Sequence, residues 1–407
     1  MPFDVANSPK ALESAVGPSL KPGGAIVVGG DYQGLGIVRS LGHHNVPICI
    51  IDDENSIARF SRYATHAVAV ASLRNQEQTV ESILEIGHRL NLRGWVLYPT
   101  RDETVAAFAR YRTLLAEFFC VPTPGWDTMQ WVWDKRNTYQ LANELGIPTP
   151  RTWYPSDERG LEQIDADPPF AVKPAIKEHF FYATKAKAWR ANNRAELKKL
   201  FQRAAAQVEP GEVMIQDLIP GDGLQQFAYC AFFKAGRAIG SMVVRRRRQH
   251  PPEFGRASTF VETIDLTLLE DLSTRFLRAI DYYGLVELEY KLDPRDGQYK
   301  LLDVNGRTWG YHALGPGAGV DFPYMLFADQ AGECVKHCRG RSGVHWIRLT
   351  TDLPTGILEI LKGRENWYTY FRSLGECDVE AVFSWKDPLP GIAELALLPY
   401  LWVRRGF

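Results

Sequence analysis

The chain has 407 residues, of which 45% are hydrophobic and 23% are charged. This balance excludes a mainly disordered chain, and the length is enough for two or three globular domains. The 47 basic and 48 acidic residues nearly cancel, so no overall charge attracts the chain to nucleic acid or to a membrane. The six cysteines are scattered along the sequence, which favours a reducing, cytoplasmic location over a disulfide scaffold.

The N-terminal third has the pattern of a layered α/β domain. Residues 1–22 are polar and broken by Pro and Gly, and we expect them to form a leader that is not a signal peptide. Over residues 23–125, short apolar strands at 25–30, 46–53 and 95–100 alternate with stretches of helical pattern. Such alternation is typical of a parallel sheet covered by helices on both faces.

A Pro- and Gly-rich joint at 121–128 leads into a region of mixed elements. One helix is predicted over 129–146, where Gly146 and Pro148 end it. Strands are predicted at 169–175 and 212–223, and a hairpin is predicted over 224–249. A second hairpin is predicted over 286–307, around the turn at 294–297. The expected fold class is therefore α/β (α+β).

The hairpin at 286–307 holds the most informative polar pattern. Because side chains alternate between the two faces of a strand, three polar residues of each strand share a face. These residues are Glu287, Glu289, Lys291, Asp303, Asn305 and Arg307. Carboxylate and amide oxygens suit Mg²⁺, and an arginine can neutralise a phosphoryl group during its transfer. A solvated hairpin face with alternating charges is the alternative.

Four segments, taken in order, resemble the ATP-grasp superfamily: WDKRNTYQLANELGIPTPRT, FAVKPA, VMIQDLIPGDG and GLVELEYKLDPRDGQYKLLDVNGR. The resemblance covers about residues 23–330, and within the superfamily the chain is most similar to the stand-alone carboxylate–amine ligases. It implies a Rossmann-like pre-ATP-grasp domain at 23–125 and ATP-grasp nucleotide-binding domains at 126–335. Residues 336–407 would form a C-terminal extension.

The resemblance also implies roles for individual residues. ATP would be held by two lysines, a hinge and a ribose-binding carboxylate, namely Lys135, Lys173, Gln216, Asp217, Leu218, Ile219 and Asp222. Mg²⁺, with Mn²⁺ as an alternative, would be bound by Glu289, Asp303 and Asn305. Arg307 would face the γ-phosphate or the acyl phosphate. Of the arginine run at 245–248, Arg247, and after it Arg245, is expected to bind a substrate carboxylate or the acyl phosphate; a solvated strand is the alternative.

The sequence departs from the family pattern in three places. Asp303 stands where the family usually has Glu, and Gly306 stands where it usually has Pro. The segment after Lys173 lacks the glycines of a phosphate-covering loop. The side chains that could cover the phosphates instead are Lys177, His179 and Lys185.

The resemblance implies an ATP-dependent ligase that joins a carboxylate to an amine through an acyl phosphate and releases ADP and phosphate. Its expected partners are small-molecule carboxylates and amines of the amino-acid kind, and not nucleic acid. Two alternatives stay open. One is an ATP-grasp kinase or carboxylase that acts on a hydroxyl or on bicarbonate, and the other is an ATP-binding module without turnover.

The C-terminal extension has no assignable chemistry. Its aromatic residues are expected to lie mainly in the core, with a cover over the site or a homodimer contact as alternatives: Trp367, Tyr368, Tyr370, Phe371 and Trp385. The apolar tail before Arg404 and Arg405 is expected to pack on the body rather than to contact a membrane. A helix is expected to carry Cys334, His337 and Cys338, whose spacing would otherwise suggest a metal site.

Overall fold

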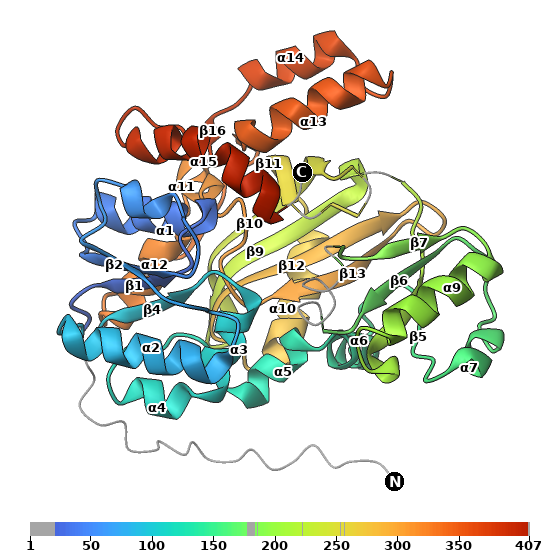
Figure 1. Ribbon diagram of the computed structural model, residues 1–407, viewed down its shortest axis with the longest axis horizontal. Coiled ribbons are helices and arrows are strands. Elements are labelled where there is room, and N and C mark those ends of the chain that lie inside the picture. Colours follow the sequence, from blue (N-terminus) through green and yellow to red (C-terminus); the bar gives the residue numbers. More distant parts are fainter. Residues whose placement is uncertain are drawn as a thin grey trace.

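In the computed structural model, the N-terminal region folds into a parallel sheet with strand order β3-β2-β1-β4 (Figure 1). The structure describes residues 21–176, 184, 186–221, 223–252, 254–255 and 257–405, with side chains as far as residue 400. Four residues discussed above therefore lie outside the described residues: Lys177, His179, Lys185 and Asp222.

Both faces of this N-terminal sheet are covered, as predicted. Ile26 and Val28 of β1 belong to a core with residues of α2 and α3, whereas Ala25 and Val27 belong to another core with residues of α1. The strands are β1 (Ala25–Val28), β2 (Ile48–Asp52), β3 (His66–Ala69) and β4 (Val96–Pro99). The helices are α1 (Tyr32–His43), α2 (Gln76–Arg89), α3 (Asp102–Arg110) and α4 (Arg112–Ala116), with a short 3-10 turn η1 (Ala58–Phe60).

The single helix predicted over 129–146 is wrong, because the structure has two helices there. α5 (Trp126–Trp133) ends at Asp134, whose backbone is extended, and α6 (Lys135–Glu144) begins at the next residue. The Asp134 side chain accepts a hydrogen bond from the backbone N–H of Arg136, which caps α6. The break places Lys135 in the first position of a helix.

A small antiparallel sheet with strand order β5-β8-β6-β7 follows. Its strands are β5 (Thr152–Trp153), β6 (Phe170–Pro174), β7 (Trp189–Ala191) and β8 (Val213–Asp217). The helices of this part are α7 (Glu158–Glu162) and α9 (Arg194–Ala205), with a 3-10 turn η2 (Pro210–Glu212). Apolar residues of α9 such as Leu197 and Phe201 pack with Phe170 and Val172 of β6.

The largest sheet has strand order β13-β12-β9-β10-β11-β15-β16, and β14 pairs with β10. Its strands are β9 (Gln226–Lys234), β10 (Arg237–His250), β11 (Ala257–Ile264), β12 (Gly284–Asp293), β13 (Gln298–Asn305), β14 (Cys338–Arg339), β15 (His345–Ile347) and β16 (Val379–Glu380). A 3-10 turn η3 (Gly223–Gln225) precedes β9, and α10 (Thr267–Ala279) follows β11. Both predicted hairpins, β9–β10 and β12–β13, are thus present.

The two faces of this sheet have different neighbours. Tyr229 and Phe233 of β9 pack in a core with Leu269 and Phe276 of α10. Cys230 of β9, which points to the other face, lies in the core shared with the N-terminal lobe. The sheet therefore separates an α10 side from a side that faces the N-terminal lobe.

The C-terminal part contributes helices and also sheet strands. Its helices are α11 (Leu314–Ala318), α12 (Phe322–Gln330), α13 (Leu349–Leu361), α14 (Trp367–Gly375) and α15 (Leu389–Arg405). Because β14, β15 and β16 join the large sheet, the predicted boundary at residue 335 does not coincide with the edge of a sheet. In the part of the chain that the structure describes, no helix is long and apolar enough to cross a membrane.

Two expectations for this part are wrong. Cys334, His337 and Cys338 do not lie on a helix, because residues 333–337 are irregular and Cys338 begins β14. Of the five aromatic residues expected mainly in the core, only Tyr370 is buried, since the short helix α14 turns a single face inward. The other four are each more than half exposed: Trp367, Tyr368, Phe371 and Trp385.

Candidate active site

The carboxylates predicted from the hairpin pattern lie on adjacent rungs of the β12–β13 ladder. Glu287 pairs with Asn305 and Glu289 pairs with Asp303. The amide nitrogen Nδ2 of Asn305 donates hydrogen bonds to Glu287 Oε2 at 3.0 Å and to Glu289 Oε1 at 3.1 Å. The alternation of side chains therefore brings these groups together on one face, as the sequence predicts.

Two lysines from separate elements lie near this cluster of carboxylates. The ammonium group of Lys135, at the start of α6, donates a hydrogen bond to Asp303 Oδ1 at 2.6 Å. Lys173, on β6, donates to the hydroxyl of Tyr139 at 3.2 Å. Burial and the positive charge of Lys135 lower the pKa of Lys173 to about 7, although Asp303 and Glu289 act in the opposite direction.

An arginine follows the hairpin and joins it to the N-terminal lobe. Arg307 donates hydrogen bonds to both carboxylate oxygens of Asp102, at 2.5 and 3.1 Å, and to Asn305 Oδ1 at 3.2 Å. Asp102 is the first residue of α3. Burial would lower the pKa of Arg307, but the neighbouring carboxylates, with Asp102 first and then Glu287 and Asp303, together raise this pKa above its ordinary value.

The arginine run on β10 is arranged differently from the prediction. Arg246 contacts Glu289, with Nη2 at 3.2 Å from Oε2. Arg245 and Arg247 instead donate to Glu262 on β11, so neither contacts the hairpin. Arg248 donates to Asp352 on α13. A β-bulge between Arg246 and Arg248 changes the alternation of faces, which the sequence alone does not predict.

The comparisons with known proteins agree with this architecture. D-aspartate ligase of Enterococcus faecium (strain Aus0004) is 22% identical over 298 residues, which are 69% of this chain and 70% of that protein. One similar solved structure is the biotin carboxylase domain of the 2-oxoglutarate carboxylase from Hydrogenobacter thermophilus, with a TM-score of 0.63 at 15% identity. That structure is a dimer in complex with MgADP, ADP and bicarbonate. That match covers 79% of this chain and 73% of the other.

The L-amino acid ligase from Bacillus licheniformis has a TM-score of 0.58 at 13% identity, over 80% of this chain and 79% of that one. The chain has the ATP-grasp fold. The ATP-grasp fold and the α/β fold class predicted from the sequence are therefore confirmed, and the matches support an enzyme that forms carbon–nitrogen bonds. No family model matches the chain.

The segment predicted to lie beside adenine, at the end of β8, forms hydrogen bonds and an ion pair with other parts of the protein. Gln216 is buried and donates from Nε2 to Tyr139 Oη and Thr152 Oγ1. The Asp217 carboxylate forms an ion pair with Arg295 at 3.0 Å. The backbone N–H of Leu218 donates to Pro169 O, and Ile219 O accepts from Lys291 Nζ at 2.9 Å. A carbonyl oxygen has a second lone pair, so Ile219 can still accept a hydrogen bond from a ligand.

The glycine at position 306, where the ATP-grasp pattern usually has Pro, has a structural reason. A Cβ atom at Gly306 would lie 2.6 Å from Met129 Cε and 3.2 Å from the hydroxyl oxygen of Tyr282. Both neighbours are buried, so they could not move aside freely. Any residue larger than glycine at position 306 would therefore press against Met129 of α5.

The donor set of the hairpin fits Mg²⁺ better than it fits a transition metal. Among the residues that the structure describes, no group of three or more His, Cys, Asp or Glu side chains is arranged to hold a metal by itself. Mg²⁺ usually takes one or two carboxylates, with phosphate oxygens and water as its other ligands. Glu289 and Asp303 are such an incomplete set of oxygen donors, whereas Asn305 turns its amide nitrogen toward Glu289 and its oxygen toward Arg307.

Sequence reasoning missed several groups of the site. Glu287 accepts a hydrogen bond from Tyr311, and burial together with the charge of Glu289 raises the pKa of Glu287 to about 7. The strand alternation placed Glu287 on the same face as Glu289, although the predicted metal ligands did not include it. The contacts of Asp102, Arg246 and Tyr311 come from tertiary packing, and no local sequence signal indicates them.

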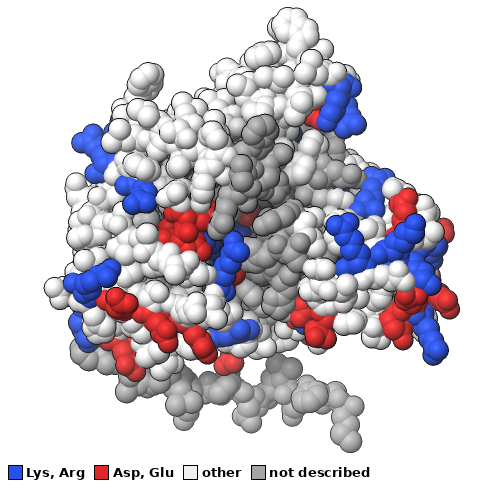
Figure 2. Space-filling model, in the orientation of Figure 1, with Lys and Arg blue, Asp and Glu red and all other residues white. Residues whose placement is uncertain are grey.

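The surface around these elements is mixed in charge. On the face shown in Figure 2, acidic and basic side chains lie side by side, with no broad area of one sign. This agrees with the nearly balanced count of charged residues. A groove of uniformly positive charge, the usual footprint of a nucleic-acid-binding protein, is not seen on this face.

Proposed function

We propose that the protein is an ATP-dependent carboxylate–amine ligase that acts on small molecules of the amino-acid kind. The observation that carries this proposal is the convergence of Lys135, Lys173 and Arg307 on the carboxylates of Glu289 and Asp303. Cations and oxygen donors brought together in this way suit the positioning and charge neutralisation on which phosphoryl transfer depends. The similarity to D-aspartate ligase and to an L-amino acid ligase favours this chemistry over that of a kinase.

In the proposed reaction, a carboxylate oxygen of the first substrate attacks the γ-phosphorus of ATP, and the bond from that phosphorus to the oxygen of ADP breaks. The amine nitrogen of the second substrate then attacks the acyl carbon. It loses a proton, and the carbon–oxygen bond to phosphate breaks. The products are an amide, ADP and phosphate, and no protein nucleophile takes part.

The proposed roles follow from position. Lys135 and Lys173 would neutralise the ATP phosphates, with the hinge at 216–219 beside adenine. Glu289, Asp303 and Asn305 would hold Mg²⁺, which supplies charge neutralisation at the phosphate oxygens when it is bound. Arg307 would face the transferred phosphoryl group. Asp102 orients Arg307, because it binds two of the guanidinium nitrogens.

We propose that Arg246, rather than Arg247 or Arg245, is the arginine of the β10 run that acts in the site. It is the one in contact with Glu289, and its side chain is largely buried. Arg245 and Arg247 both bind Glu262 on β11 instead of a residue of the β12–β13 hairpin. A role in binding an anionic group of the substrate therefore fits Arg246 best.

The test is a screen of pooled amino acids, dipeptides and other amines and carboxylic acids with Mg²⁺ and ATP. ADP, phosphate and new products are measured by mass spectrometry, and the Asp303→Asn variant serves as the inactive control. An amide product formed together with ADP would support the proposal. A stable phosphorylated or carboxylated product would support a kinase or a carboxylase, and nucleotide binding without stimulated phosphate release would support a module without turnover.

A further inference from the structure

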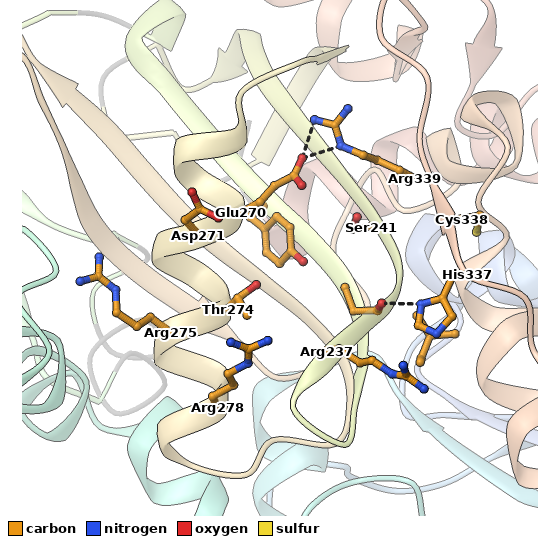
Figure 3. A pocket seen from close by; sticks show the side chains of 13 residues that line it. Arg237, Ser241, Glu270, Asp271, Thr274, Arg275, Arg278, His337, Cys338 and Arg339 are labelled. Atoms are coloured by element: carbon orange, nitrogen blue, oxygen red, sulfur yellow. Dashed lines mark hydrogen bonds and ion pairs between the residues drawn. The ribbon is translucent and has the colours of Figure 1, made fainter.

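An open pocket of about 780 Å³ lies on the α10 side of the large sheet (Figure 3). Its floor includes Tyr229 of β9 and Ser241 of β10, and its walls come from α10 and from residues 337–339. Tyr229 is paired with Leu288, and both pack in the core under α10. Glu287 and Glu289, the neighbours of Leu288, point to the opposite face, so this α10 pocket is separate from the candidate active site.

Four arginines line the α10 pocket, and three of them have no carboxylate partner. Arg237, Arg275 and Arg278 form no ion pair with any acidic group that the structure describes. Arg275 donates to the backbone oxygen of Leu145, and Arg278 donates to that of Gly236. Backbone carbonyls do not cancel a positive charge, so the three guanidinium groups leave a local excess of positive charge in a chain with a net charge of −1.

The acidic residues of the pocket do not remove this excess. Glu270 is engaged by Arg339, which also binds Asp265, so these three charges form a closed group. Asp271 is the other carboxylate of the lining. The group of Arg339 with two carboxylates carries a net charge of −1 and Asp271 adds another, so the three other guanidinium groups leave an excess of one positive charge. In Figure 3, Arg237 and Arg278 project from the two sides of the pocket, from β10 and α10 respectively.

Hydroxyl groups lie at the bottom of the pocket between these arginines. The hydroxyl groups of Tyr229, Ser241 and Thr274 line the pocket. Hydroxyls donate to anionic oxygens, and guanidinium groups bind carboxylates and phosphates with two parallel hydrogen bonds. The volume is within the range of sites for small metabolites.

We infer that the α10 pocket binds a small molecule that carries two or more carboxylate or phosphate groups. A single anionic group would engage one guanidinium group, whereas a di- or trianion can engage two of them. Because the pocket opens away from the hairpin carboxylates, this molecule would bind at a site separate from the candidate active site. The inference does not depend on the proposed ligase activity.

The experiment is calorimetric titration of the full chain, without metal or nucleotide, with citrate and separately with pyrophosphate. We expect saturable binding of at least one probe at one site per chain. The variant Arg237→Ala/Arg278→Ala should bind at least about tenfold more weakly, since two charge-assisted contacts are lost. The variant Arg89→Ala/Arg372→Ala, with the same change of net charge on helices outside the pocket, should bind as the wild type does. The stronger probe shows whether the site prefers carboxylates or phosphates.

A second variant separates this pocket from the candidate active site. Lys135→Ala/Lys173→Ala should leave the binding of the preferred probe unchanged. Three results would overturn the inference: no saturable binding of either probe, equal weakening in the pocket variant and its charge-matched control, or loss of binding in the lysine variant. Melting temperatures of all variants show whether each one is folded.

Discussion

The ammonium nitrogen of Lys135 lies 2.6 Å from a carboxylate oxygen of Asp303, although 168 positions separate the two residues in the sequence. Lys135 begins α6 and Asp303 lies on β13, so this ion pair joins the helix to the hairpin. Tyr139, four residues further along α6, donates to the backbone oxygen of Leu302 on the same strand. The two contacts fix a proposed phosphate-binding lysine beside a proposed metal ligand.

The variant Asp303→Asn should lose turnover by a factor of about 100 or more while it keeps its fold. The substitution preserves the shape of the side chain but removes the charge that faces Lys135 and Mg²⁺. Substrate-dependent phosphate release measures the effect, and Asp281→Asn, on the exposed turn that follows α10, is the matched control. Asp303→Glu, which restores the usual family residue, should keep most of the activity; full activity of Asp303→Asn would contradict the site.

Nucleotide binding should become coupled to proton uptake as the pH rises above about 7, the pKa of Lys173 in the unliganded protein. Below that pH the amine is already charged. Above that pH the amine of Lys173 is mostly neutral, but the phosphate groups bind its charged form, so each protein molecule takes up a proton when it binds nucleotide. The affinity for nucleotide should therefore fall about tenfold per pH unit until the pH reaches the pKa of Lys173 in the bound state. Calorimetry of ATP binding in buffers with different ionisation enthalpies measures this uptake, which Lys173→Met should abolish. Uptake that persists in Lys173→Met would assign it to another group.

The same shift affects the stability of the unliganded protein. Because the folded-state pKa of Lys173 is lower than its unfolded value of 10.5, the unfolded chain binds more protons between pH 7 and 10.5. Stability contributed by this group should therefore rise with pH through that window. Denaturant unfolding at a series of pH values should show the wild type gaining stability relative to Lys173→Met as the pH rises. A constant difference between the two proteins would contradict the lowered pKa.

Among the arginines of β10, Arg246→Gln should reduce turnover by a factor of about 100. Arg247→Gln should reduce it by less than about tenfold, because Arg245 continues to compensate Glu262. Steady-state rates at saturating ATP, with the second substrate varied, compare the two variants. If Arg247→Gln were the more severe change, the original prediction from the sequence would be right and our reassignment to Arg246 would be wrong.

The pair Asp102–Arg307 should couple the N-terminal lobe to the hairpin. Asp102→Asn leaves the largely buried guanidinium group without its carboxylate, at an expected cost of about 2 kcal/mol in unfolding free energy. It should also lower kcat more than it changes KM for ATP, since Arg307 is then less well oriented. A double-mutant cycle with Arg307→Gln measures the coupling in both quantities, and additive effects would show that the ion pair has no role in orientation.

Much of the site could be predicted from the sequence because it rests on local patterns. The alternation along residues 286–307 placed Glu289 and Asp303 on one face, and the turn at 294–297 identified their strands as partners. A β-bulge between Glu289 and Tyr290 does not change this pairing, because it lies beyond the pairs Glu287–Asn305 and Glu289–Asp303. The bulge in β10 lies within the arginine run itself, so simple alternation does not decide there which arginine acts in the site.

Other features could not be predicted because they depend on tertiary packing. The apolar pattern continues through Asp134, so one helix was expected, although Asp134 has the side chain of an N-cap and could have marked the break. The aromatic residues of α14 were expected in the core because aromatic side chains are usually buried. Which face of a nine-residue helix meets the body is decided by its neighbours, here Arg248, which lies over the ring of Tyr370.

The most direct test of the central claim follows the oxygen atoms of the carboxylate substrate. With a substrate pair from the screen and both carboxylate oxygens labelled with oxygen-18, mass spectrometry of the released phosphate reports whether the carboxylate was phosphorylated. An acyl-phosphate ligase transfers one labelled oxygen to each phosphate, and it forms ADP only when carboxylate and ATP are both present. Unlabelled phosphate, with all of the label remaining on the carboxylate-derived product, would contradict the proposed reaction.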